Sequence, residues 1–272
     1  MIRDAAFGQY YPGDSFAHKM DPRSKLMITV LFIATVFFSN SFAAFGCCAA
    51  FLLICIFNSD IPFRSVLRSV KPILLLIVIS TILNLLFYRQ GKVLLDLRII
   101  KITDGGIRFT LIMIMRLVML VMGSALLTLT TTPVALTDGI ESLLKPLNLV
   151  RFPVHELALI MSIALRFIPT LMNETDRIIS AQKARGADFE SGNLLSRAKA
   201  LLPILIPLLI SAFRRADELS DAMDSRCYRG AKGRTKMKRL KFHGRDFVAL
   251  SLCLMTLAFA IIDKFVLFLP LI

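Results

Sequence analysis

Two arginines of this chain follow the same spacing, in which an aspartate is followed five residues later by an alanine and four residues after that by the arginine. The two sets are Asp176, Ala181, Arg185 and Asp217, Ala222, Arg226. An aliphatic residue lies seven positions before each arginine, so in a helix the cation extends an apolar stripe. A planar guanidinium at such a place suits bidentate binding of a partner's carboxylate. The alternative is an ordinary helix end, where an arginine complements the helix dipole and Gly186 stops the helix.

Other chemistry-bearing sets are missing from the sequence. No G-x-x-x-x-G-K-[ST] phosphate loop is present, so the chain does not hydrolyse ATP itself. We also find no serine, histidine and aspartate set, no HExxH helix and no paired carboxylates within the apolar runs. The three histidines are far apart, and the five cysteines lack zinc-site spacing and are expected to pack as small hydrophobic residues. We therefore expect a non-enzymatic protein with no metal and no cofactor.

The elements that must position the arginines belong to an integral membrane protein. The chain has 272 residues, 56% of them hydrophobic and none of them tryptophan, and apolar runs recur from end to end. Its first 20 residues are mixed and polar, so no cleavable signal peptide is expected. Five membrane spans are predicted, at about 24–39, 41–58, 70–88, 107–131 and 246–265, since a bilayer core needs about 20 apolar residues per helix.

Polar residues between and within these spans restrict how the helices can be arranged. The first two spans are separated only by Ser39, Asn40 and Ser41, which favours a tight hairpin over one overlong helix. Arg116 interrupts the fourth span, and we expect it to face a helix interface because charges inside membranes usually avoid lipid. The alternative is that it extends toward the membrane surface.

The charge distribution predicts the orientation. With the N-terminus inside, 26 of the 33 basic residues lie in inner segments and six in outer ones. Lysine and arginine concentrate on the cytoplasmic side of membrane proteins. The sequence therefore predicts a cytoplasmic N-terminus and an outer C-terminus in the cell membrane, although the loop from Arg89 to Arg108 is basic too.

Both arginine sets lie in the long segment before the last span. We divide the chain into residues 1–132, a cytoplasmic coupling region at 133–245, and residues 246–272. The middle segment carries 19 basic and 11 acidic residues. Three helices are predicted in it, from Pro133 to about Lys145, from Pro153 past Pro169 to Gly186, and from about Leu194 to Arg226. The apolar run 201–213 leaves open whether the third helix dips into the membrane.

A basic run, 229–241, comes after the second arginine set. It could bind nucleic acid, but it borders the fifth span, where anionic lipid headgroups attract such runs. We expect the membrane surface as its partner and no nucleic acid.

Three motifs in order carry a family resemblance. They are GQYYPGDSFAHKMDPRSKL, LRFIPTLMNETDRIISAQKARGAD and RRADELSDAMDSRCYRG. Together they resemble the transmembrane T component of energy-coupling factor (ECF) vitamin transporters, over nearly the whole chain. The resemblance implies an all-α membrane protein that joins two ABC-type ATPase subunits to a small membrane substrate-binding (S) subunit, in the lipid bilayer.

The resemblance also implies what the arginines do. In that family two coupling helices end in Ala-Arg-Gly motifs whose arginines insert into grooves of the ATPases. Ala184, Arg185 and Gly186 match the first motif. At the second, Ser225, Arg226 and Cys227 keep only the arginine, and Arg229 is a rival for the contact.

Three other functions stay open. A T component dedicated to cobalt or nickel would have the same architecture. A self-contained carrier or channel needs a polar path, for which we see only Asn84, Arg116 and a few hydroxyls, with no acidic residue buried in the apolar cores. An integral membrane enzyme would need a catalytic set that the sequence lacks.

Overall fold

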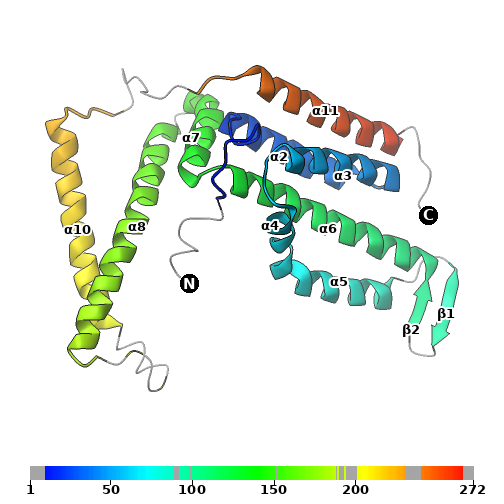
Figure 1. The fold of residues 1–272 in the computed structure, drawn as a ribbon, viewed down its shortest axis with the longest axis horizontal. Coiled ribbons are helices and arrows are strands. Elements are labelled where there is room, and N and C mark those ends of the chain that lie inside the picture. The colour runs from blue at the N-terminus through cyan, green and yellow to red at the C-terminus, as the bar shows by residue number, and fades with distance from the viewer. Residues whose placement is uncertain are drawn as a thin grey trace. The chain divides into compact units, whose positions relative to one another are not determined.

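Helices dominate the structure, a computed structural model that describes residues 10–88, 92–97, 100–150, 152–187, 189, 193, 201–230 and 240–265 (Figure 1). The elements in chain order are α2 (Pro22–Phe38), α3 (Phe42–Phe57), α4 (Phe63–Arg68), the 3-10 helix η1 (Lys71–Ile73), α5 (Leu74–Phe87), β1 (Val93–Leu97), β2 (Ile100–Thr103), α6 (Asp104–Thr130), α7 (Pro133–Leu144), the 3-10 helix η2 (Lys145–Val150), α8 (Val154–Ala184), α10 (Leu202–Ser225) and α11 (Gly244–Phe265). The predicted class, an all-α membrane protein, is confirmed.

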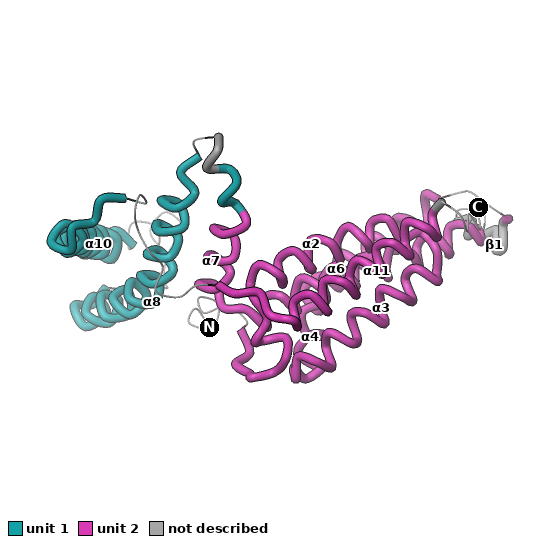
Figure 2. Tube along the Cα trace, turned by 90° about the horizontal axis from the view of Figure 1, so that it is seen from above, with its two compact units in different colours: residues 1–8, 144–239 teal, residues 9–143, 240–272 magenta. Residues whose placement is uncertain are grey.

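The chain divides into two compact units, shown in teal and magenta in Figure 2. One comprises Met1–Gly8 and Leu144–Arg239 and holds α8 and α10. The other comprises Gln9–Leu143 and Leu240–Ile272 and holds the remaining α-helices, with nearly all of α7. The chain therefore leaves the second unit after α7 and returns to it just before α11.

Capping residues explain where several helices of the second unit begin. Asp21 precedes α2 and its carboxylate accepts the backbone N–H of Arg23 at 2.9 Å, while Pro22 occupies the first turn. The Ser41 hydroxyl accepts the backbone N–H of Ala44 at the start of α3. Thr103 does the same for Gly106 at the start of α6. Each cap satisfies a backbone donor that the first turn leaves free.

The predicted hairpin between the first two spans is confirmed, because α2 ends at Phe38 and α3 begins at Phe42. Arg116 of α6 reaches this turn, and its Nη2 donates to the Ser39 carbonyl at 2.9 Å and to the Asn40 side-chain oxygen at 3.2 Å. The Ser39 carbonyl lies at the C-terminal end of α2, where a cation is favoured. Arg116 therefore faces a helix interface, as predicted.

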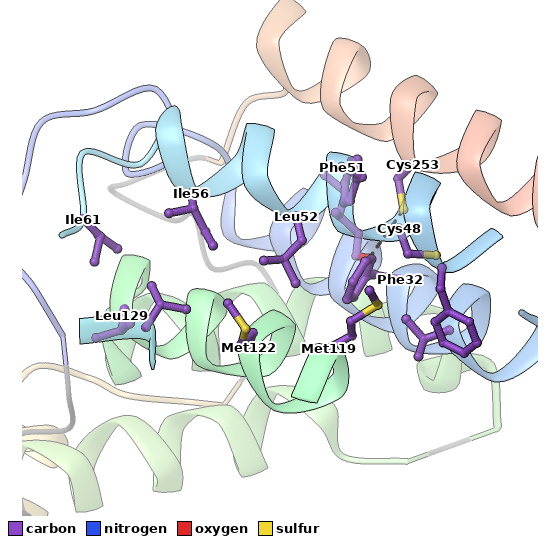
Figure 3. Packing of buried hydrophobic residues seen from close by; sticks show 14 residues of the cluster. Phe32, Cys48, Phe51, Leu52, Ile56, Ile61, Met119, Met122, Leu129 and Cys253 are labelled. Atoms are coloured by element: carbon purple, nitrogen blue, oxygen red, sulfur yellow. Dashed lines mark hydrogen bonds between the residues drawn. The ribbon is translucent and has the colours of Figure 1, made fainter. Parts of the chain in front are cut away.

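The core of this unit lies between α2, α3, α6 and α11. Phe32 of α2 stacks on Phe51 of α3 with ring centroids 5.7 Å apart, and Met119 and Met122 of α6 contribute to the same cluster (Figure 3). Cys253 of α11 is fully buried there. The Phe32 ring of α2 packs directly on α6 at Gly123, since a Cβ at that position would lie 2.7 Å from two ring carbons of Phe32. A larger residue at position 123 would have to displace this buried ring.

Four stretches of the described residues are long and apolar enough to cross a membrane. They are Phe63–Phe87, Asp104–Thr130, Val154–Ala184 and Gly244–Lys264, and Phe42–Phe57 is a shorter apolar helix. Residues 154–184 meet this criterion although we placed them in the coupling region. Length and composition alone therefore do not separate α8 from the predicted spans.

Several features differ from the expectations. The loop after α5 forms a short antiparallel hairpin, β1–β2, with Val93 opposite Thr103 and Leu97 opposite Ile100. The stretch that contains the third span is interrupted, with η1 around Pro72 between α4 and α5, because proline there lacks the N–H of a regular helix. Two acidic residues of α11, Asp246 and Asp263, are 2% and 9% exposed and lie near the two ends of the last span, outside the apolar core for which no buried acidic residue was expected.

The predicted coupling helices are present with small changes of boundary. Helix α7 ends at Leu144, one residue before the predicted end, and α8 continues past Pro169 to Ala184. The third helix, α10, begins at Leu202; the predicted start near Leu194 lies outside the described residues.

Candidate functional site

The first candidate site is the C-terminal end of α8. Arg185 is the capping residue, with φ −86° and ψ 6°, and Gly186 follows with a left-handed φ of 87°. The Gly186 N–H donates to the Lys183 carbonyl at 3.0 Å, and the Ala187 N–H donates to the Gln182 carbonyl at 3.0 Å. These two bonds, running back by three and by five residues around a left-handed residue, define a Schellman motif.

The second candidate site, at the end of α10, is built in the same way. Arg226 is the capping residue, with φ −91° and ψ 12°. The Cys227 N–H donates to the Asp224 carbonyl at 2.9 Å, and the Tyr228 N–H donates to the Met223 carbonyl at 3.1 Å. Cys227 has a φ of 55° and thus adopts the left-handed conformation that usually requires glycine.

The two arginines therefore occupy equivalent positions in two equivalent helix ends. Their backbone angles agree within about ten degrees, and the next residue is left-handed in both. Arg185 and Arg226 are both exposed, as are Ala184 and Ser225 before them and Gly186 and Cys227 after them. Arg229 is also exposed but lies beyond the Schellman motif, so it has no counterpart at the end of α8.

Helices α8 and α10 run antiparallel and contact each other within one unit. Gln182 near the end of α8 donates to the carbonyl of Pro203 at the start of α10, at 3.4 Å. Farther along, Arg215 of α10 pairs with Glu174 of α8 at 3.7 Å. The two arginine ends therefore lie at opposite ends of the pair. The 24 residues of α10 separate them by roughly 36 Å at the usual helical rise.

The same two helices carry large apolar side chains that are exposed in the described chain. Those on α8 are Leu157, Ile160, Met161 and Ile168. Those at the start of α10 and along it are Leu201, Leu202, Leu205, Ile206, Leu209, Ile210 and Phe213. Their spacing places each set along one side of its helix. The pair thus combines two exposed cationic ends with apolar faces that suit lipid or another apolar protein surface.

Sequence reasoning missed a second group of polar residues, at the start of α2. Asp21, Lys25 and Asp246 are each less than 10% exposed. Asp21 precedes a proline in DPRSK, which is a recognisable helix start, and this was the available signal. That Asp246, 225 residues later, bonds to the same helix start is visible only in the fold.

Comparison with known proteins gives a family match. Residues 13–237 match the model of the CbiQ family, described as a cobalt transport protein. The matched range includes α8, α10 and both arginine ends.

Individual relatives are similar over almost their whole length. A protein of Clostridium kluyveri named energy-coupling factor transporter transmembrane protein EcfT is 52% identical over 94% of this chain and 95% of its own. Proteins of the same name from Ruminiclostridium cellulolyticum and Bacillus subtilis are 47% and 43% identical, over 98% and 90% of this chain and 100% and 93% of theirs.

Proposed function

Because the chain belongs to the CbiQ family and is an EcfT-type transmembrane component of an energy-coupling factor transporter, we propose that it couples two ABC-type ATPases to a small substrate-binding membrane subunit. In this proposal the chain is a multi-pass, non-enzymatic scaffold for vitamin uptake. Motion driven by ATP in the two ATPases reaches the substrate-binding subunit through α8 and α10.

The observation that carries the proposal is the equivalence of the Arg185 and Arg226 helix ends. Two exposed guanidinium groups in the same local geometry can be bound by two sockets of the same kind. Their separation of roughly 36 Å means that one small groove could not hold both. Two similar ATPase subunits would supply two such sockets.

The equivalence also favours Arg226 over Arg229 as the second docking residue. Arg226 and Arg185 precede a left-handed residue by one position, whereas Arg229 lies beyond the motif that ends α10. In this proposal Gly186 and Cys227 share one role, which is to end the helix so that the preceding arginine is presented at its tip. Ala184 and Ser225 are the small residues on the other side of each arginine.

The exposed apolar sides of α8 and α10 support the membrane partner. The substrate-binding subunit is proposed to lie against them, because large apolar side chains gain most from burial against a lipid-embedded surface. We also propose the orientation predicted from charge, with the N-terminus and residues 133–245 cytoplasmic and the C-terminus outside.

The transported substrate has two candidates. Vitamin uptake rests on the motif resemblance, whereas the family description names cobalt and so favours cobalt or nickel. Uptake assays with labelled riboflavin, thiamine, biotin and folate, and in parallel with labelled Co²⁺ and Ni²⁺, separate the two.

The proposal is tested by reversing the charge of the docking residues. Arg185→Glu, Arg226→Glu and the double variant are expressed with all subunits, and ATPase copurification in mild detergent is measured together with uptake. A buried cation–carboxylate contact typically contributes about 2 to 5 kcal/mol when one partner is removed, so each single variant should lose most of one ATPase. Arg229→Glu is the matched control and should bind normally. A double variant that copurifies both ATPases at the unmodified level would refute the proposal.

A further inference from the structure

The start of α2 contacts the chain next to both ends of the predicted coupling region, residues 133–245, hereafter the coupling segment. The segment leaves after α6, which ends at Thr130, and returns before α11, which begins at Gly244. Lys25 of α2 donates from Nζ to the Thr130 carbonyl at 3.0 Å. The backbone N–H of Asp21 donates to Asp246 Oδ1 at 3.0 Å. One helix turn thus contacts the departing and the returning chain.

Asp246 joins two stretches of backbone. Its Oδ1 accepts from Asp21, and its Oδ2 accepts the N–H of His243 at 2.8 Å. The residue is 2% exposed, so this carboxylate has exchanged water for fixed backbone donors. Breaking such a contact would leave buried polar groups unpaired, so this attachment is costly to open.

Lys25 is buried beside it, with 8% exposed. Its ammonium donates to the His18 carbonyl at 3.2 Å as well as to Thr130. Two fixed backbone carbonyls therefore replace part of the water that this buried cation has lost.

Two cation–aromatic contacts cross the same boundary in opposite directions. The Arg23 guanidinium of α2 lies 5.7 Å from the ring centroid of Phe242, in the returning segment. The Arg245 guanidinium of α11 lies 6.0 Å from the ring centroid of Phe16, in the segment before α2. Each contact adds a modest attraction, and together they hold the returning chain from both sides.

Helix α7, the first helix of the coupling segment, packs directly on this turn. A Cβ at Gly139 would lie 3.1 Å from Pro22 Cβ and 3.2 Å from both the Pro22 backbone carbon and a methyl carbon of Leu26. At Gly139 the backbone of α7 therefore lies directly against Pro22 and the Leu26 side chain.

We propose that the start of α2, with Asp21, Lys25, Asp246 and Gly139, is a rigid joint that transmits movement of the coupling segment to the membrane helices. This inference rests on the proposed function. Because the departing and returning chains are fixed to the same turn, force on either one moves α2, α6 and α11 together instead of being absorbed in a loop. In this proposal the joint residues are positioning residues that act through the helices they hold.

The test separates transmission from docking. Asp246→Asn removes one acceptor of the two backbone bonds, and Gly139→Leu separates α7 from α2. Gly46→Leu is the matched control, because Gly46 lies inside α3 with no atom within 4 Å of an added Cβ. The complete transporter is expressed with each variant, and chain level in the membrane, ATPase copurification and uptake of the labelled substrate that the unmodified chain transports are measured.

Asp246→Asn and Gly139→Leu should keep both ATPases while uptake falls at least about tenfold, and Gly46→Leu should behave as the unmodified chain. Gly139→Ala, which needs shifts of only a few tenths of an ångström, should give a smaller loss and serves if Gly139→Leu does not accumulate. Unchanged uptake in Asp246→Asn and Gly139→Ala would overturn the joint, and so would loss of the ATPases from these variants at normal chain levels. If the proposed function is wrong, the unmodified chain will copurify no ATPase. That result would also remove the basis of the joint.

Discussion

The left-handed residue that ends each arginine helix gives a prediction with opposite signs at the two sites. Gly186 has a φ of 87°, and a Cβ added there would have no atom within 4 Å. The cost of Gly186→Ala is therefore the backbone cost alone, about 1 kcal/mol for a side chain in the left-handed region. At 25 °C this makes the opening of the helix end about fivefold more frequent.

At the second site the natural chain already bears this cost, because Cys227 has a φ of 55°. Cys227→Gly should lower the cost by about 1 kcal/mol and make opening about fivefold rarer. Cys227→Ala is the control, because it removes the thiol but keeps a Cβ in the same conformation. It should leave the helix end unchanged.

Hydrogen exchange followed by mass spectrometry measures this opening in the complete chain. The Ala187 and Tyr228 N–H groups donate to carbonyls five residues earlier, so peptides covering 181–187 and 222–228 report the two motifs. Gly186→Ala should speed exchange about fivefold in the first peptide, and Cys227→Gly should slow it about fivefold in the second. Equal exchange in Gly186→Ala and the unmodified chain, or the same slowing in Cys227→Ala as in Cys227→Gly, would refute the reasoning.

Two further predictions use other features of the chain. Gly123→Leu should destabilise the helix bundle by about 1 to 3 kcal/mol through overpacking against Phe32, whereas Gly46→Leu should not. The measurement is the temperature at which the detergent-solubilised chain loses its monomeric chromatography peak. Equal temperatures for the two variants would contradict the close packing at Gly123. In a chain expressed without its ATPase partners, a charged, membrane-impermeant maleimide should label the exposed Cys227 in inside-out vesicles and not in intact cells, while the buried Cys48 and Cys253 stay unlabelled in both. Labelling of Cys227 in intact cells would place the coupling segment on the outer side.

The helices were predictable because their signals are local. Proline and serine or aspartate at helix starts, and unbroken apolar runs, predicted α2, α3, α6, α7 and α11 within a few residues. The hairpin after α5 was not predicted, because the alternation of its short strands is weak and its strand pairing depends on register. Composition alone does not decide whether α8 crosses the membrane. The helix is long and apolar enough to do so, although it lies in the predicted coupling region.

The candidate site was predictable in its residues but not in its geometry. The repeated spacing identified Arg185 and Arg226, and Gly186 identified one helix end. Nothing in the sequence indicated that Cys227 would take the glycine's left-handed conformation, because that conformation is rare for residues with a Cβ. The group around Asp246 was missed because its partners lie 225 residues apart, and only packing brings them together.

The contacts between α8 and α10 are weaker than the contacts at the start of α2, and the proposed transmission of movement uses this difference. Among their described residues, α8 and α10 bury only Val154 and Ile204, and the ion pair between Glu174 and Arg215 has side chains about one-third exposed. Such an ion pair contributes about 0 to 1 kcal/mol, and we infer that the two helices shift against each other more readily than the start of α2 can be opened. The start of α2, by contrast, is fastened by a carboxylate that is 2% exposed and accepts two backbone N–H groups. In the proposed function, a weakly held helix pair attached to a firmly held helix start would convert a change in the separation of the two ATPase sockets into movement of the membrane helices. If instead the start of α2 were weakly held, the change would be absorbed there before it reached the membrane helices.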